Sequence, residues 1–405
     1  MKLTHCSTII ASFIGYITQA ITINFAPLLF VTFGNQFQLS YSKISSLIAV
    51  TFCIQLFTDA ITSRFPSLFR PRQTVVLAQL FACIGIAGFG LFPKFLPPYP
   101  ALLLAVILSG AGSGLVEVMV TPIVESCPTD RKSAFMCLLH SFYCWGQMLV
   151  TLLSTFYFSL VGIGNWEYLA YLWACIPLLD LVLFCFVPIY PIGSEEGAND
   201  TRSYMKNKVF WLIFVMMICS GAAEQAMSQW ASTFAETGLG VDKALGDLLG
   251  PCLFAALMGC SRVLYAKVGD RISLNRFMAL SGGLCIVSYL LAALSGNPIL
   301  SLVGCALCGL SVGVMWPGNI SNASALLPGS GISMFAFLAL AGDIGCLAGP
   351  SLVGTVAERF GNNIRVSFLL SLIFPVGLLI ALALSVHYAK KEKQKNGNTN
   401  HPYTN

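Results

Sequence analysis

Long apolar runs recur along this chain of 405 residues and constrain its fold more than any other feature. A helix needs about 20 mostly apolar residues to cross the hydrocarbon core of a bilayer. Twelve runs of roughly this length are separated by short polar or proline-containing breaks. They predict an all-α membrane protein with twelve transmembrane helices near residues 5–33, 41–63, 74–93, 99–127, 131–160, 166–190, 208–235, 243–268, 273–294, 298–327, 331–357 and 363–388.

The composition agrees with a bilayer as the solvent. Hydrophobic residues make up 56% of the chain and charged residues 10%, whereas a soluble domain carries about 25% charged residues. So apolar a chain has too few polar side chains to cover a surface in water. The net charge is +5, and no basic run is interleaved with aromatic residues. We therefore expect a lipid bilayer, and no nucleic acid, as a partner.

The basic residues predict the orientation of the chain. With both termini placed in the cytoplasm, 17 of the 22 Lys and Arg residues fall on the inner side. Cytoplasmic loops of membrane proteins carry such an excess. We therefore expect a multi-pass protein of the plasma membrane with cytoplasmic termini. The basic tail at residues 389–405 contains Lys390, Lys391, Lys393 and Lys395, and it is either simply solvated or bound to anionic lipid.

The chain is predicted to form two pseudo-symmetric halves of six helices. Residues 191–207 are the longest polar stretch between helices and indicate a cytoplasmic linker between bundles at 1–190 and 208–388. Leu108, Gly110 and Gly114 match Leu307, Gly309 and Gly313 at a constant offset, and Ser133, Phe135 and Leu138 likewise match Ser333, Phe335 and Leu338. The matched helices run in the same direction, so the predicted repeat is parallel.

Fifteen cysteines raise the question of disulfides or a metal site. Most of them lie inside apolar runs, where a thiol packs as a small hydrophobic group. Cys305 and Cys308 form a CxxC motif, but no second pair of ligands follows at a suitable spacing. We expect free thiols, no metal site and no cofactor. The chain also lacks a nucleophile–base pair or a phosphate-binding loop, so we do not expect an enzyme.

Five acidic residues fall inside the predicted spans: Asp59, Glu117, Asp180, Glu224 and Asp343. An ionised group at the centre of a bilayer costs at least about 2.5–3.5 kcal/mol on insertion scales, so such residues point to function. Glu117 is the strongest candidate, because it follows three glycines and precedes Thr121-Pro122. A carboxyl group in a poorly solvated cavity binds a proton more readily than one in water. Glu117 is therefore predicted to couple transport to protons, or else to hold neighbouring helices together through hydrogen bonds.

Polar side chains on four predicted helices are candidates for solute binding. Rows of polar residues would be unfavourable against lipid and should face a wet cavity. An amide, an imidazole or an aromatic face suits a sugar-like solute, although each residue can instead hold helices together or pack in the core. The candidates are Gln19 and Asn24, His140 and Gln147, Glu224 and Gln225, and Trp316 and Asn319, with a helix kink expected at Pro317.

Three further charged residues of the predicted spans have candidate roles other than solute binding. Asp343 lies among small residues in the eleventh span. It is either a second proton-coupling group or the partner of a polar residue in the other half. Asp59 and Arg262 lie near the inner ends of the second and eighth spans, where they are candidates for gating or for packing between helices. Asp180, in the sixth span, has no assigned role.

The chain resembles the major facilitator superfamily over nearly its whole length. The stretch Gly114–Pro122 is similar to the Glu-x-x-x-Asn-Pro motif of the fucose/proton symporter family, with Thr121 in place of Asn. The resemblance implies a proton-coupling role for Glu117 and a sugar contact for His140. The family's helix-1 aspartate has no counterpart near Asn24. The superfamily's loop motif is degenerate around Asp59 and better kept at Gly269-Asp270-Arg271, which implies gating roles for Asp270 and Arg271.

The sequence therefore predicts a secondary active transporter that works by alternating access. Proton-coupled uptake of a sugar or a similar small polar solute fits the polar residues on four spans. The alternative is proton-coupled efflux of amphipathic compounds, which the many Phe, Met and Cys residues would suit. We expect a monomer.

Overall fold

The computed structural model describes residues 4–65, 69–129, 132–190, 205–268, 272–327 and 331–399. Every regular element in these ranges is a helix. Twelve of the helical segments are long and apolar enough to span a membrane. Most of them begin and end within a few residues of the twelve predicted spans. The fifth and eleventh apolar segments start later, at Ser141 and Phe337, but the helices that contain them start near the predicted positions. The all-α membrane fold is thus confirmed.

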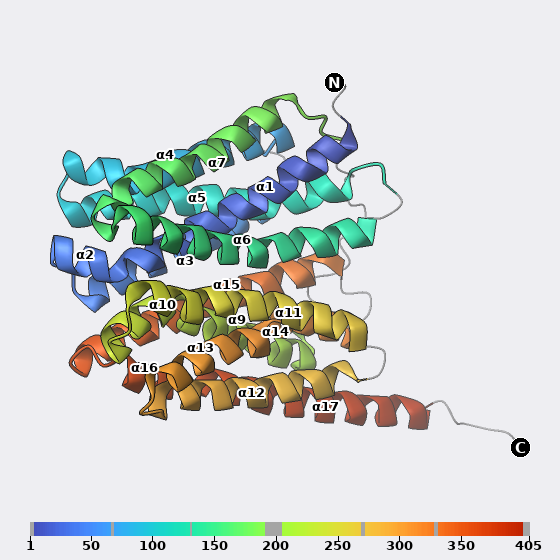
Figure 1. The fold of residues 1–405 in the computed structure, drawn as a ribbon. Coiled ribbons are helices and arrows are strands. Elements are labelled where there is room, and N and C mark those ends of the chain that lie inside the picture. The colour runs from blue at the N-terminus through green and yellow to red at the C-terminus, as the bar shows by residue number, and fades with distance from the viewer. Residues whose placement is uncertain are drawn as a thin grey trace, which may run out of the picture.

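The first half contains the elements up to α7. They are α1 (His5–Asn24), η1 (Ala26–Leu29), α2 (Phe30–Phe37), α3 (Tyr41–Arg64), α4 (Pro71–Leu91), η3 (Phe92–Lys94), α5 (Pro98–Glu125), α6 (Lys132–Val161), η4 (Ile163–Asn165) and α7 (Trp166–Phe186). In Figure 1 these elements form the upper bundle.

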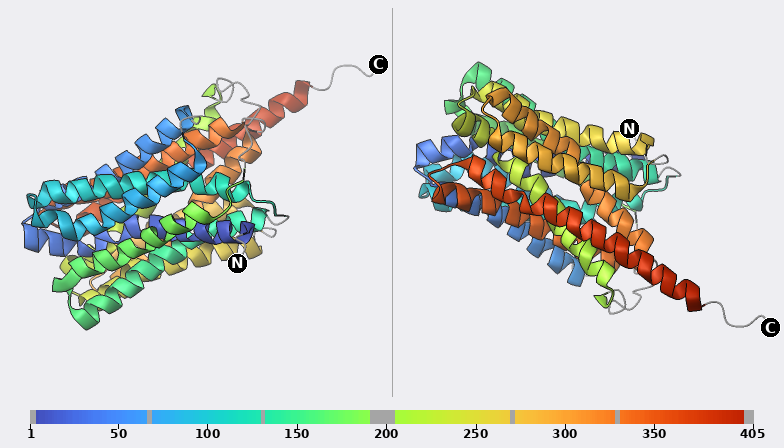
Figure 2. Two further views of the ribbon diagram at one scale, coloured as in Figure 1. Left: turned by 90° about the horizontal axis from the view of Figure 1, so that it is seen from above. Right: turned by 90° about the horizontal axis from the view of Figure 1, so that it is seen from below.

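The second half begins at α9 and forms the lower bundle in Figure 1. Its elements are α9 (Lys208–Thr233), η5 (Phe234–Gly238), α10 (Lys243–Asp247), η6 (Leu248–Cys252), α11 (Leu253–Val268), α12 (Leu274–Leu294), α13 (Pro298–Val312), α14 (Met315–Leu326), α15 (Gly331–Arg359), α16 (Ile364–Ser371) and α17 (Ile373–Thr399). Both chain ends lie at one end of the molecule and α2 at the other (Figures 1 and 2). We call these the terminal end and the α2 end. The helix α17 continues to Thr399, well into the segment expected to be a tail.

The glycines matched in the sequence have the same packing role in each half. A Cβ atom on Gly110 of α5 would lie 3.2 Å from the Thr51 carbonyl oxygen of α3. A Cβ atom on Gly309 of α13 would lie 2.1 Å from the Phe254 carbonyl oxygen of α11. In both halves the fourth span therefore approaches the second span closely because glycine offers no side chain. This equivalence supports the parallel repeat.

Several of the described spans are interrupted near prolines, and three of them are the first, eighth and tenth. The first changes from α1 to the 3₁₀ segment η1 around Pro27, and the eighth contains the π segment η6 around Pro251. The tenth breaks at Gly313–Val314, four residues before the kink expected at Pro317. Proline has no N–H, and its ring clashes with the carbonyl group four residues earlier. For Pro317 this is the carbonyl group of Gly313. The break therefore lies at the carbonyl group that Pro317 displaces.

Candidate functional site

Glu117 lies on α5 at the centre of a polar cluster in the first half. It is partly buried and accepts a hydrogen bond of 2.8 Å from Gln19 Nε2 of α1. Gln55 Nε2 of α3 donates to the same carboxylate oxygen. Both glutamines are almost fully buried, at 5% and 3% exposure. Three helices therefore meet at this carboxyl group. We call the Glu117 carboxyl group and the amides of Gln19 and Gln55 the Glu117 site.

A second contact between α1 and α5 lies about one turn away. The hydroxyl groups of Tyr16 and Thr121 are 3.1 Å apart. Thr121 occupies the position of the asparagine in the family motif described above. A hydroxyl can replace an amide here because it can both donate and accept a hydrogen bond.

Arg262 of α11 brings positive charge from the second half. Its Nε donates to the Gly313 carbonyl oxygen at 3.1 Å, the group that Pro317 leaves without its helical partner. The guanidinium group interacts electrostatically with Glu224 of α9 and, across the two halves, with Tyr16. The kink in the tenth span therefore supplies the carbonyl group that holds this cation near polar groups of both halves.

Glu224 belongs to a chain of polar groups on α9. Gln225 Nε2 donates to Glu224 Oε1 at 3.2 Å, and Gln229 Nε2 donates to Gln225 Oε1 at 3.1 Å. Glu224 also acts electrostatically on Tyr143 of α6, whose hydroxyl is 3.5 Å from Asn24 Nδ2. The predicted row on the seventh span thus faces the first half of the chain.

Three other candidates for solute binding are engaged with protein atoms. Gln147 Nε2 of α6 donates to Ser228 Oγ of α9 at 2.8 Å, which links the halves directly. Asn319 is fully buried and donates to Ser220 Oγ at 2.8 Å. The ring of Trp316 lies so close to Gly342 that a Cβ atom there would be 2.1 Å away. The sequence left two roles open for Gln147, solute binding and a hydrogen bond between helices. The structure contains the hydrogen bond between helices.

The remaining intramembrane acids take two different places. Asp180 of α7 is fully buried within the first half, where Gln79 Nε2 of α4 donates to it at 2.7 Å. Asp59 of α3 and Asp343 of α15 contact each other across the halves. Asp343 thus has a polar partner in the other half, which was one of the two roles expected for it.

Some predictions lie outside the described part of the chain, and two site residues were not anticipated. The side chain of His140, and Asp270 and Arg271, are among the residues that the structure does not describe. Gln55 and Tyr143 were missed. Gln55 could have been found, since it precedes Asp59 by four residues on one face of the predicted second span.

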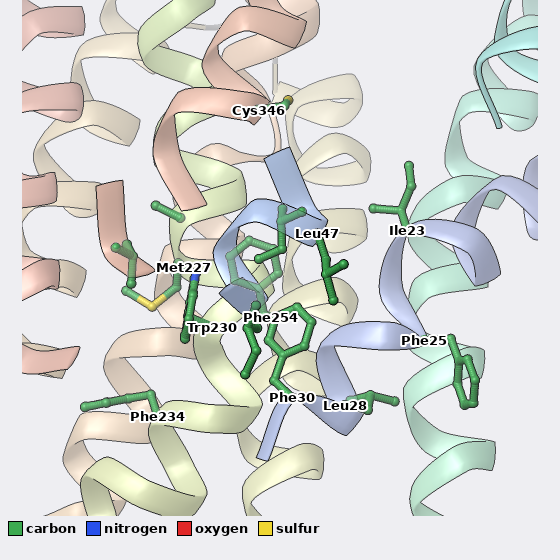
Figure 3. Close-up of a cluster of buried hydrophobic side chains, with 14 of the residues drawn as sticks. Ile23, Phe25, Leu28, Phe30, Leu47, Met227, Trp230, Phe234, Phe254 and Cys346 are labelled. Atoms are coloured by element: carbon green, nitrogen blue, oxygen red, sulfur yellow. The ribbon is translucent and has the colours of Figure 1, made fainter. Parts of the chain in front are cut away.

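The two halves are joined at the α2 end. Lys243 Nζ of α10 donates to the Leu28 carbonyl oxygen of η1 at 2.7 Å and pairs with Asp247 at 3.2 Å. The Asp247 side chain is only 1% exposed. Figure 3 shows Phe30 and Leu47 of the first half beside Trp230 and Phe254 of the second. The ring centroids of Phe30 and Trp230 are 5.7 Å apart. The hydrogen bond from Lys243 to Leu28 and the apolar packing therefore close this end.

A small cavity lies between the closed end and the polar groups. Its volume is about 20 Å³, enough for one water molecule. Most of its lining is apolar and comes from the first half, chiefly from η1 and α3, with Thr22, Thr51 and Gln229 as the polar members. Among the described residues, no group of three or more His, Cys, Asp or Glu side chains is arranged to hold a metal ion.

The architecture defines the class of the protein. Twelve spanning helices in two similar halves surround polar and charged side chains at their interface, away from lipid. This arrangement is that of a membrane transporter whose halves move against each other.

A sequence model of the Major Facilitator Superfamily matches residues 8–334 and residues 252–402, so the chain belongs to this superfamily. Membrane protein MosC of Rhizobium meliloti is 22% identical over 359 residues, covering 86% of this chain and 82% of that protein. The fold is similar to that of the nucleoside transporter NupG, with a TM-score of 0.75, 13% identity and coverage of 94% and 99%. A D-xylose-proton symporter gives a TM-score of 0.71, 15% identity and coverage of 94% and 96%. The partially occluded inward-open structure of the xylose transporter XylE from E. coli gives a TM-score of 0.75 at 12% identity. The match covers 95% of this chain and 97% of that chain.

Proposed function

We propose that this transporter couples proton movement to the uptake of a sugar-like or similar small polar solute. The observation that carries the proposal is the Glu117 carboxylate held by the amides of Gln19 and Gln55. Two proteins of similar fold are a D-xylose-proton symporter and the nucleoside transporter NupG. Amides and carboxylates suit such solutes because their hydroxyl groups both donate and accept hydrogen bonds.

Protonation of Glu117 would change what its neighbours can bind. The ionised carboxylate only accepts, and it engages both amides. Both amides donate to one oxygen, Oε2, and protonation of this oxygen makes it a donor. The amides of Gln19 and Gln55 then become free to turn towards a solute hydroxyl. Proton binding and solute binding would then favour each other, as symport requires.

The proposed location is the plasma membrane, with both termini in the cytoplasm. The α2 end then faces the outside, and its closed contacts belong to a state that is shut towards the exterior. Return to the outward-facing state requires the Lys243–Leu28 contact and the Phe30–Trp230 packing to separate. Gating by Asp59 and Arg262, and by the loop residues Asp270 and Arg271, belongs to this proposed cycle.

The apolar lining of the small cavity favours a second candidate, proton-coupled efflux of an amphipathic compound. Such a solute would contact residues such as Phe52 and Phe89 and would leave the polar row on α9 unused. The two candidates differ in their solute and direction, so one assay separates them.

Proteoliposomes with an external pH dye, challenged with a panel of sugars and polyols, test the proposal. One sugar is expected to make the outside more alkaline in the intact protein, and Glu117→Gln should reduce this signal at least tenfold. Asp180→Asn, a change at a buried carboxyl group that contacts Gln79 away from the site, is the matched control. No response to any sugar from folded protein, or an unchanged signal in Glu117→Gln, would contradict the proposal.

A further inference from the structure

The helices α3 and α15 form a continuous contact between the two halves. Near the α2 end, Ser45 Oγ of α3 donates to the Pro350 carbonyl oxygen of α15 at 3.1 Å, and Gly354 lies directly against Ser45. Further along the same helices, towards the terminal end, the carboxyl groups of Asp59 and Asp343 meet in hydrogen-bonding contact. Each half therefore contributes one carboxyl group to this contact.

Neither carboxyl group has a full set of hydrogen-bond donors. Asp343 is 4% exposed, and its Oδ2 has no donor among the described residues. The same holds for Asp59 Oδ1. A buried carboxylate oxygen without a donor loses its hydration and gains nothing in return. The two acids therefore lack the neighbours that would stabilise two negative charges.

The charged groups described around the pair are also acidic. Glu117, from α5, interacts electrostatically with both aspartates, and Cys346 of α15 lies near Asp343. Arg262 acts on Glu224 and donates to the Gly313 carbonyl oxygen. Two unit charges about 4 Å apart repel by roughly 4 kcal/mol at an effective dielectric constant near 20. One proton placed between the two oxygens replaces this repulsion with a hydrogen bond.

We propose that Asp59 and Asp343 form a second proton-binding site, which holds one proton shared between the halves while α3 and α15 are in contact. When these helices separate, each carboxyl group reaches water on its own and the shared proton is released. Proton binding at this pair is thereby linked to the movement of the halves. The inference does not depend on the proposed function, because it requires neither a particular solute nor a coupling role for Glu117.

Infrared spectroscopy of the protein in lipid vesicles tests the proposal. At neutral pH, the carbonyl-stretch band of a protonated carboxyl group is expected in the intact protein. Asp59→Asn and Asp343→Asn should each remove the same band, since a shared proton belongs to both residues. Each should also lower the number of protons released on alkaline titration by about one per molecule. Glu117→Gln and Asp180→Asn should leave this particular band in place.

Two results would overturn the proposal. A band that survives in both single variants places no proton on the pair, and a band lost only in Glu117→Gln places the proton on Glu117. The variants are expected to fold, because an asparagine amide can donate to the remaining carboxylate. If a single variant does not fold, the double variant Asp59→Asn/Asp343→Asn, in which two amides keep the hydrogen bond, provides the same comparison.

Discussion

The amide of Gln55 contacts Glu117 as directly as that of Gln19, which leads to a quantitative prediction. A hydrogen bond to a charged group contributes about 1.5–3 kcal/mol, so Gln55→Leu is expected to slow solute uptake by about tenfold to a hundredfold. Gln19→Leu should have an effect of similar size. The measurement is the initial rate of uptake into proteoliposomes containing equal amounts of folded protein.

The matched control is a double-mutant cycle. In a Glu117→Gln background, Gln55→Leu should have little further effect, because residues that share one interaction are not additive. Equal losses in both backgrounds would mean that Gln55 acts independently of Glu117.

The sequence singled out Glu117, which lies in the structure beside two buried amides, but it identified only one of these two partners as a site residue. A lone acid in an apolar span is visible in the sequence because its burial is costly. Which amides reach it depends on how α1, α3 and α5 are rotated against each other, and a single sequence does not specify this rotation. For this reason Gln19 was anticipated while Gln55 was missed. The pairing of Asp59 with Asp343 likewise depends on how the halves are docked.

At the scale of the helix, close glycine contacts predict where substitutions disrupt the fold. A Cβ atom at Gly309 of α13 would lie 2.1 Å from the Phe254 carbonyl oxygen, so Gly309→Ala must push α13 away from α11. Overpacking of this kind costs about 1–3 kcal/mol. We expect a lower thermal unfolding midpoint in detergent than for the intact protein.

The chain provides a matched control for this change. A Cβ atom on Gly283 of α12 would have no other group within 4 Å, and alanine favours helix over glycine by about 1 kcal/mol. Gly283→Ala should therefore leave the midpoint unchanged or raise it. Equal midpoints for the two variants would show that the contact between α13 and α11 contributes nothing to stability.

Helix positions were predictable because the bilayer imposes their length, and the breaks were harder. The kink expected at Pro317 is displaced to Gly313–Val314, since proline disturbs the carbonyl group of the preceding turn. The π segment η6 contains Pro251, but the π segment η5 leaves no comparable pattern in the sequence. Thr237 of η5 contacts Tyr41 of the first half at the α2 end, so we attribute η5 to tertiary packing rather than to local preference.

For the molecule as a whole, the charge pattern and the fold constrain orientation in different ways. An even number of spans brings both termini to one end (Figure 1), but the fold alone does not say on which side of the membrane that end lies. The excess of Lys and Arg assigned to the terminal end predicts, through the positive-inside rule, that this end faces the cytoplasm. With this predicted orientation the structure is closed towards the outside, because the Lys243–Leu28 hydrogen bond and the Phe30–Trp230 packing join the halves at the α2 end.

Thiol labelling of intact cells tests the orientation. Phe95, between η3 and α5, is 79% exposed at the α2 end, and Pro128, after α5, is exposed at the terminal end. A membrane-impermeant maleimide is expected to label Phe95→Cys from outside, above the background of the unsubstituted protein. Pro128→Cys should react only after permeabilisation, since its loop carries basic residues that remain in the cytoplasm. The reverse pattern would place the terminal end outside and would make the closed α2 end the cytoplasmic gate.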